Sequence, residues 1–199
     1  MSRRLEDEVE KMVALIIGDY ENGRDIDRVN LFDKPDKAQI VDIVHKLFQI
    51  VFPGYFRERM LKTYSASNRL SVLVEDLIYR LNQQIRLALP YKREFSEASE
   101  SEVNAEAERI VSEFFKQIPR VRAYVETDLQ AAFDGDPAAG SKEEIILAYP
   151  GLMASTVNRL AHELYLLHVP LIPRIMTEYA HTDGNRYSSG CNYRDIFFH

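Results

Sequence analysis

The sequence predicts an all-α fold, and three observations support this prediction. Apolar residues recur at three- and four-residue spacing, with charged residues between them, along most of the chain, which is the pattern of amphipathic helices. No segment shows the sustained alternation of a half-buried strand. Short stretches rich in turn-forming residues separate the periodic segments. We therefore expect seven or eight helices and no confident strand.

The first helix is expected over residues 5–19. The basic start of the chain is followed by acidic residues and only a short apolar stretch, which favours an amphipathic helix over a signal peptide. The second helix is expected over residues 35–51, with Pro35 in its first turn, and a break follows at Gly54. The third helix is expected over residues 69–89.

Two further helices are expected over residues 103–117 and 121–133. The polar run at residues 96–102 precedes them, and the carboxylates around Ser101 favour a helix N-terminus. This run is short enough to link an N-terminal helical extension, residues 1–95, to a second helical region, residues 96–181. The segment D-G-D-P-A-A-G-S at residues 134–141 is predicted to be a loop.

The C-terminal part of the chain changes character at residue 181. A helix is expected over residues 151–168, a turn over residues 170–174 and another helical segment over residues 175–181. Residues 182–199 have neither helical nor strand periodicity, so we expect a short irregular tail there.

Composition limits the classes of function. A chain of 199 residues with 46% hydrophobic and 28% charged residues is large enough for a packed core and has a polar surface. A net charge of −6 gives no reason to expect binding to nucleic acid or to an anionic membrane. The single cysteine, Cys191, excludes an internal disulfide, and no apolar run is long enough for a membrane span. We therefore expect a cytoplasmic protein.

The motif H-E-x-x-x-x-H at His162, Glu163 and His168 resembles a zinc site only superficially. Two histidines that share a metal on a helix are four residues apart, whereas these are six apart and lie on different faces. We expect no metal here, and instead a packed or hydrogen-bonded helix histidine. The lone His45 is likewise expected to be a core or interface residue. No glycine-rich nucleotide motif or nucleophile elbow is present, so local motifs supply no acyl-CoA site.

Two ordered groups of residues carry a family resemblance. The C-terminal group is N-R-L-A-H-E-L-Y within residues 151–168, P-L-I-P-R at residues 170–174 and I-M-T-E-Y-A-H at residues 175–181. The upstream group is D-L-Q-A at residues 128–131, followed by D-P at residues 136–137. Together they resemble the N-terminal helical domain of serine O-acetyltransferases. The resemblance covers residues 100–181 well and the first hundred residues more loosely.

The resemblance implies acetyl transfer from acetyl-CoA to L-serine, which gives O-acetyl-L-serine, the first step of cysteine biosynthesis. It also implies that Asp136 helps to bind the serine, through the substrate ammonium group, at a site that the β-helix of a neighbouring subunit completes. A carboxylate suits this role because charge-assisted hydrogen bonds are stronger than neutral ones. The alternative is that D-G-D-P only forms a turn, in which the aspartate binds backbone N–H groups.

The catalytic left-handed β-helix of the family should follow residue 181, and it is absent from this sequence. Residues 183–199, back-translated and read one nucleotide forward, allow T-G-I-D-I-H-P-G-A-T-I-G-T-Y-F-F-I. The family text at this place looks like T-G-I-D-I-H-P-G-A-x-I-G-x-x-F-F-I-D-H. We interpret the tail as the product of a frameshift near residue 182. Arg186 and Ser188 then stand where the catalytic dyad's aspartate motif should be, and the histidine of the dyad is not encoded.

Two functions from different classes follow. The first is a serine O-acetyltransferase family member in truncated form, which binds no acetyl-CoA and is inactive alone. The second is a stand-alone helical oligomerisation or interaction module. Under either, we expect a homo-oligomer formed through the helical domain, or association with an intact homologue. Docking to cysteine synthase is not expected, because the family's C-terminal tail is missing. An unrelated helical scaffold would require both groups of matching residues to be coincidental.

Overall fold

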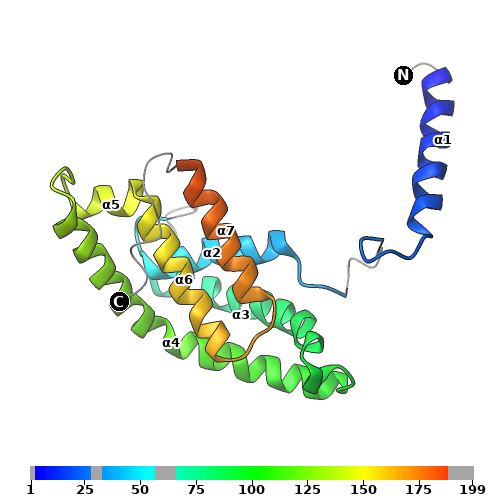
Figure 1. Cartoon of the computed structure of the whole chain (residues 1–199). Coiled ribbons are helices and arrows are strands. Elements are labelled where there is room, and N and C mark those ends of the chain that lie inside the picture. The colour runs from blue at the N-terminus through cyan, green and yellow to red at the C-terminus, as the bar shows by residue number, and fades with distance from the viewer. Residues whose placement is uncertain (1–2, 28–32, 57–65, 188–199) are drawn as a thin grey trace. The chain divides into compact units, whose positions relative to one another are not determined.

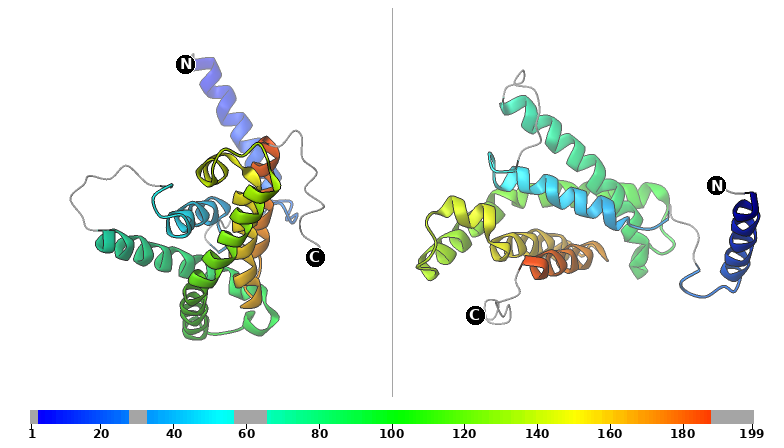
Figure 2. Two further views of the ribbon diagram at one scale, coloured as in Figure 1. Left: turned by 90° about the vertical axis from the view of Figure 1, so that its left-hand side faces the viewer. Right: turned by 90° about the horizontal axis from the view of Figure 1, so that it is seen from above.

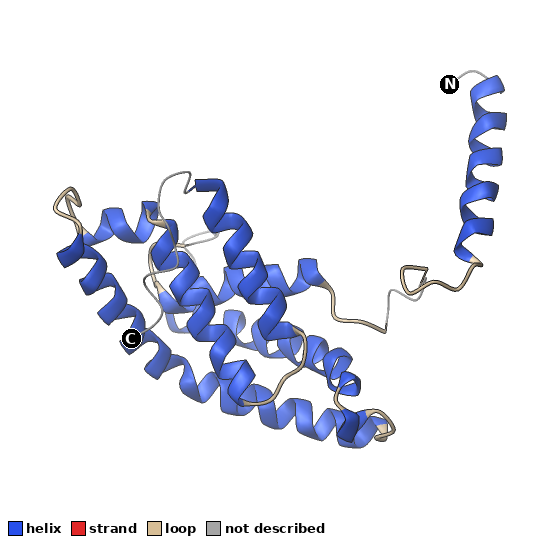
Figure 3. Ribbon diagram, in the orientation of Figure 1, coloured by secondary structure: helices blue, strands red, loops and turns tan. Residues whose placement is uncertain are grey.

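The computed structural model describes residues 3–27, 33–56 and 66–187, and most of these residues are helical (Figure 1). Within these ranges it has seven α-helices, two short 3-10 helices and no strand (Figure 3). The predicted all-α fold is therefore confirmed. None of the described helices is both long and apolar enough to cross a membrane.

The chain divides into two compact units, Met1–Lys34 and Pro35–His199. The first unit contains α1 (Arg3–Tyr20), as the spacing of its apolar residues predicts. A turn after α1 is held by Arg24, whose guanidinium pairs with Asp19 and donates a 2.8 Å hydrogen bond from Nε to Asp27. These contacts tie the turn to the last residues of the helix.

The second unit contains the six other α-helices, and Figure 2 shows α6 and α7 side by side. In chain order they are α2 (Lys37–Val51), α3 (Ala66–Ala88), α4 (Glu100–Gly135), α5 (Lys142–Ala148), α6 (Pro150–Leu166) and α7 (Ile172–Tyr187). The 3-10 helices, Leu89–Tyr91 and Arg93–Phe95, connect α3 to α4. Helix α4 packs against α3 and α6, and α2 packs against α3 and α7. One hydrophobic core receives buried side chains from all six α-helices.

The start of α2 differs slightly from the prediction. Asp36, rather than Pro35, is the boundary residue, and its Oδ1 accepts a 2.8 Å hydrogen bond from the N–H of Ala38. The N–H of Asp36 itself donates to the buried side chain of Gln84 on α3 over 2.7 Å. The second unit is thus anchored to its own core within two residues of its first residue.

Helix α4 corrects a second prediction, because it is one helix of 36 residues where two were expected. It begins earlier than Val103, at a capping box in which Ser99 and Glu102 satisfy each other's backbone N–H groups. It also continues through Pro119, although an interior proline costs about 3 kcal/mol. Phe114, Ile118 and further apolar residues on the same face are buried on both sides of the proline. Burial of each large side chain contributes about 1.5–3 kcal/mol, so packing outweighs the proline penalty.

The end of α7 corrects a third prediction. The helix runs to Tyr187, six residues beyond the expected boundary at His181. Extending an existing helix adds one hydrogen bond for each residue fixed, whereas starting a helix is costly, so even weakly helical sequence can continue a formed helix. Residues 188–199 of the predicted irregular tail lie outside the described part of the chain.

Candidate functional site

Asp136 lies at the end of α4, at the start of the connection to α5. Its Oδ1 accepts a 2.9 Å hydrogen bond from the N–H of Ala138, and its carbonyl accepts one from the N–H of Ala139 over 3.0 Å. These bonds form the turn that the sequence D-P-A-A favours. Asp136 therefore forms the turn that the alternative interpretation predicted, and this turn is compatible with a binding role as well.

The second carboxylate oxygen of Asp136 has a partner that the sequence analysis did not identify. The hydroxyl of Tyr149, the residue between α5 and α6, donates a 2.7 Å hydrogen bond to Asp136 Oδ2. This bond, with a smaller effect from the Ala138 N–H, holds the pKa of the Asp136 carboxyl below its usual range. It also raises the pKa of Tyr149 to about 12. Asp136 is therefore a carboxylate at neutral pH, with its orientation fixed from two sides.

This carboxylate keeps the capacity to bind a cation. An ionised carboxylate offers roughly four lone-pair positions, and the two described bonds use one on each oxygen. The side chain is only half-buried, so a donor can reach the remaining positions. An ammonium group, with three N–H donors, is the kind of ligand that such a site accepts.

The connection between α4 and α5 is closed at its other end by Glu144. Its Oε2 accepts a 2.9 Å hydrogen bond from the N–H of Gly140, and Ser141 caps α5 by accepting from the N–H of Glu144 over 3.2 Å. A Cβ added at Gly140 would lie 3.0 Å from Glu144 Oε2, so the Glu144 carboxylate would have to shift slightly to admit a larger residue. The turn that carries Asp136 is thus shaped by hydrogen bonds at both ends.

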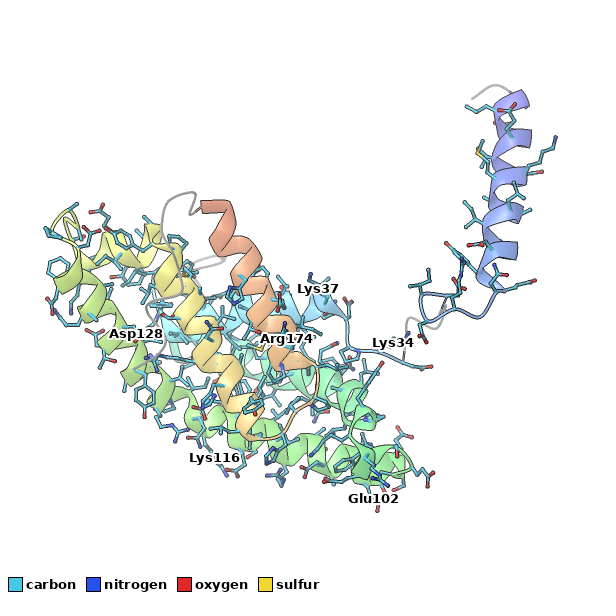
Figure 4. All side chains as sticks on the ribbon, in the orientation of Figure 1. Lys34, Lys37, Glu102, Lys116, Asp128 and Arg174 are labelled. Carbon is cyan, nitrogen blue, oxygen red and sulfur yellow. The ribbon has the colours of Figure 1, made fainter. Side chains whose placement is uncertain are left out.

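The two groups of residues that carried the family resemblance meet in space. Arg159, from N-R-L-A-H on α6, donates two hydrogen bonds of 2.6 and 2.5 Å to Asp128, the aspartate of D-L-Q-A on α4. Figure 4 labels Asp128 on α4. The guanidinium also lies 5.0 Å from the centre of the Tyr124 ring. Asp128 therefore holds α4 and α6 together, and Asp136 is the member of the upstream group that presents a free acceptor.

The three residues of H-E-x-x-x-x-H, at His162, Glu163 and His168, have different environments. His162 is exposed on α6, and its ring stacks against that of Tyr165 with centroids 6.2 Å apart. Glu163 is buried and accepts a 2.7 Å hydrogen bond from Arg120 of α4. His168 lies beyond the end of α6 with a positive φ of 58°. In the described residues, no group of three or more His, Cys, Asp or Glu side chains is arranged to hold a metal ion.

His45 occupies an interface between helices. Its Nε2 lies 2.7 Å from the hydroxyl of Tyr179, which joins α2 to α7. The two rings meet edge to face, with centroids 5.7 Å apart. This contact agrees with the expected packing role.

No protein-family model matches the chain, but individual relatives do. A plasmid serine acetyltransferase of Synechococcus elongatus is 32% identical over 152 residues, which are 75% of this chain and 48% of that protein. The serine acetyltransferase of Synechocystis is 42% identical over 53 residues, or 27% of this chain and 21% of that protein. This chain thus spans about half the length of the first relative and less of the second.

Solved structures of serine acetyltransferases are also similar to this chain. Serine acetyltransferase 1 of Entamoeba histolytica, crystallised with L-cysteine, superposes with a TM-score of 0.57 at 27% identity, over 70% of this chain and 46% of that one. The native form of that protein superposes with a TM-score of 0.57 over 90% of this chain and 60% of that one; at 23% identity it shows the fold alone. All secondary-structure elements in the described part of this chain are helices.

Proposed function

Since this chain is homologous to serine acetyltransferases over their helical N-terminal region, we propose that it is the helical part of a serine O-acetyltransferase. The reaction is transfer of an acetyl group from acetyl-CoA to L-serine, in the synthesis of cysteine. The similarity to the Synechococcus elongatus protein over 75% of the chain carries this proposal. A cytoplasmic location is part of the proposal.

Asp136 is the residue we assign to the substrate. Its carboxylate would accept hydrogen bonds from the ammonium group of L-serine, while Tyr149 and the Ala138 N–H hold it in place. The lowered pKa of Asp136 supports this role, because only the ionised form attracts an ammonium group. The β-helix of a neighbouring subunit would supply the rest of the site.

The 199-residue polypeptide should not perform the reaction by itself. A serine hydroxyl is a weak nucleophile at neutral pH and needs a general base, such as a histidine oriented by an aspartate. The described helices offer no such pair beside Asp136, whose side-chain partners there are Tyr149 and the Ala138 N–H. Purified chain should release no CoA from acetyl-CoA and L-serine, with an intact serine acetyltransferase as the positive control. Formation of O-acetylserine above the no-protein rate would overturn this proposal.

The proposed frameshift is tested at the level of nucleic acid. If the DNA after codon 181 stays open in the neighbouring frame for roughly another hundred codons with a hexapeptide repeat, the chain derives from a complete enzyme gene. If that frame closes at once, the stand-alone interaction module is favoured instead.

The second candidate is a stand-alone interaction module, and one observation favours it. Large apolar side chains are exposed on the second unit, among them Leu147 and Tyr165 at 65% and Leu166 at 51%. They would favour a homo-oligomer or association with an intact homologue. Light scattering after size-exclusion chromatography tests this: a monomer at all concentrations, alone and mixed with an intact homologue, would exclude it. Neither candidate requires acetyl-CoA to bind this chain.

A further inference from the structure

Tyr149 is fixed beside Asp136 by its backbone, its ring and its hydroxyl. It is the residue at which α5 ends and α6 begins, and its N–H donates a 3.1 Å hydrogen bond to the carbonyl of Ile145. Its ring is partly buried against the hydrophobic core, while its hydroxyl donates to Asp136 Oδ2 over 2.7 Å. Packing and hydrogen bonding therefore place the phenol oxygen next to the carboxylate.

Toward a ligand, the phenol oxygen of Tyr149 can act only as an acceptor. A tyrosine hydroxyl carries one proton, and here that proton is committed to Asp136. The same bond raises the pKa of Tyr149 to about 12, so the proton stays on the phenol at neutral pH. Between the residues that the structure describes, no hydrogen bond is donated to this oxygen. Its capacity to accept one is therefore available to a ligand.

Together, Asp136 and Tyr149 present two neighbouring acceptors. Each carboxylate oxygen of Asp136 already accepts one bond, from Ala138 or from Tyr149, and keeps one lone-pair position. Since Asp136 Oδ2 and the Tyr149 oxygen are 2.7 Å apart, one nitrogen atom can lie within hydrogen-bonding distance of both. The pair carries one negative charge, and both side chains are partly exposed. A cation with more than one N–H group is the ligand that matches this arrangement.

We propose that Asp136 and Tyr149 form a site for a primary ammonium group, in which one N–H donates to the Asp136 carboxylate and a second donates to the Tyr149 oxygen. This site rests on the proposed function for the identity of its ligand, the ammonium group of L-serine. Tyr149 then touches the substrate itself, in addition to orienting Asp136. A tertiary ammonium group, with a single N–H, satisfies only one of the two acceptors and should bind less tightly.

Two cations of equal charge test this site on the 199-residue chain. Methylammonium has three N–H donors and trimethylammonium has one, so comparing them separates hydrogen bonding from charge. Each is titrated at neutral pH and constant ionic strength, and carbon NMR of the labelled Asp136 carboxyl and the labelled Tyr149 Cζ reports binding. Methylammonium should bind about threefold more tightly, which is the effect of roughly one weak hydrogen bond. The Tyr149 signal should shift clearly with methylammonium and much less with trimethylammonium.

Conservative variants separate the contributions of the two residues. Tyr149→Phe keeps the ring and should bring the two affinities together. Tyr165→Phe, at an exposed tyrosine of α6, is the matched control and should leave the preference for methylammonium unchanged. Asp136→Asn should abolish saturable binding of both cations, which the N–H signal of Ala138 can follow in place of the lost carboxyl.

The outcomes distinguish this site from the proposed function. A preference for methylammonium that persists in Tyr149→Phe, or equal affinities in the unchanged chain, would overturn the contact with Tyr149. The proposed function would stand in both cases, because Asp136 alone would still hold the ammonium group of serine. If neither cation shifts the Asp136 signal, the ammonium site is wrong, and the assignment of Asp136 to the substrate falls with it.

Discussion

Arg159 of α6 and Asp128 of α4 form a two-pronged ion pair, with N–O distances of 2.6 and 2.5 Å, between two segments that lie 31 residues apart in the sequence. A second pair, Arg120 to Glu163, joins the same helices with the positions of acid and base exchanged. Sliding α6 along α4 would break both pairs. The polar contacts therefore define how these two helices align, while the core supplies most of the stability.

The planar guanidinium should be required for the first of these pairs. Arg159→Lys should lower the free energy of unfolding by about 1–2 kcal/mol, because lysine cannot form the two parallel hydrogen bonds or stack on Tyr124 in the same way. Urea unfolding followed by circular dichroism measures the change. Arg109→Lys is the matched control: it affects an exposed pair within one helix, with Glu106, and should change stability by less than about 0.5 kcal/mol. Equal effects at the two positions would contradict this prediction.

The buried carboxylate of Glu163 should make Arg120 important. Arg120→Met should cost about 2 kcal/mol, since it leaves Glu163 without its cation in a site where the carboxylate is only 8% exposed. The double variant Arg120→Met/Glu163→Leu should recover most of that loss, because no charge then remains buried. Thermal unfolding of the two variants measures the difference. If Arg120→Met were destabilising only because packing is lost, the double variant would be less stable than the single variant.

Tyr149 should control the titration of Asp136. In Tyr149→Phe the pKa of the Asp136 carboxyl should rise toward its ordinary value of 3.8, which carbon NMR of labelled aspartate can follow. A lowered carboxyl pKa stabilises the folded state above the ordinary value, and that stability is lost as the pH falls through the folded value. The raised Tyr149 pKa stabilises the fold below the ordinary tyrosine value of 10.0, and this is lost as the pH rises through about 12. Tyr149→Phe should therefore be less stable than the parent protein between the ordinary pKa values of 3.8 and 10.0, and equally stable at acid pH. An unchanged Asp136 pKa would show that the hydroxyl bond does not form.

His168 should be replaceable by glycine with a gain in stability. It follows the end of α6 with a φ of 58°, while its N–H bonds to the carbonyl of Tyr165 and the next N–H bonds to that of Leu164. This is the helix-ending arrangement in which glycine is preferred, because a Cβ is strained at positive φ. His168→Gly should raise stability by about 0.5–1 kcal/mol, measured as an increase in Tm. His168→Ala keeps the Cβ and should bring no gain, so an equal gain from alanine would contradict the strain argument.

Pro119 offers a test of how α4 is stabilised. Pro119→Ala should restore one backbone hydrogen bond on the exposed side of the helix and stabilise the chain by about 1–2 kcal/mol. Chemical denaturation measures this difference. If the variant were less stable, the proline would be adapted to a bend in α4, and the packing explanation for the continuous helix would be wrong.

The periodic spacing of apolar residues was sufficient to predict most helices but not every boundary. It located α1, α2 and α3 to within a few residues, because each has a single apolar face in a continuous segment. It divided α4 at Pro119, because local propensity contains no information about burial on both sides of the proline. It ended α7 too early, because the continuation of a helix depends on the turns already formed.

The candidate site was predicted only in part. Asp136 was singled out by its D-P sequence within the family resemblance, and its substrate role stays a prediction. Tyr149 was missed because it lies 13 residues away in a separate connection, and only the folding of α5 between them brings its hydroxyl to the carboxylate. An A-Y-P-G sequence indicates a helix start, but it does not indicate where the phenol lies.

The hydrogen bond from the Asp36 N–H to Gln84 has a consequence for how such a protein can evolve. This bond joins the second residue of the second unit to a buried side chain of the same unit, so the unit is anchored at its start by its own residues. The segment before Pro35 takes no part in this bond, and changes in its sequence can accumulate without breaking it. An appendage with that freedom is where new associations can be acquired while an older scaffold is inherited unchanged.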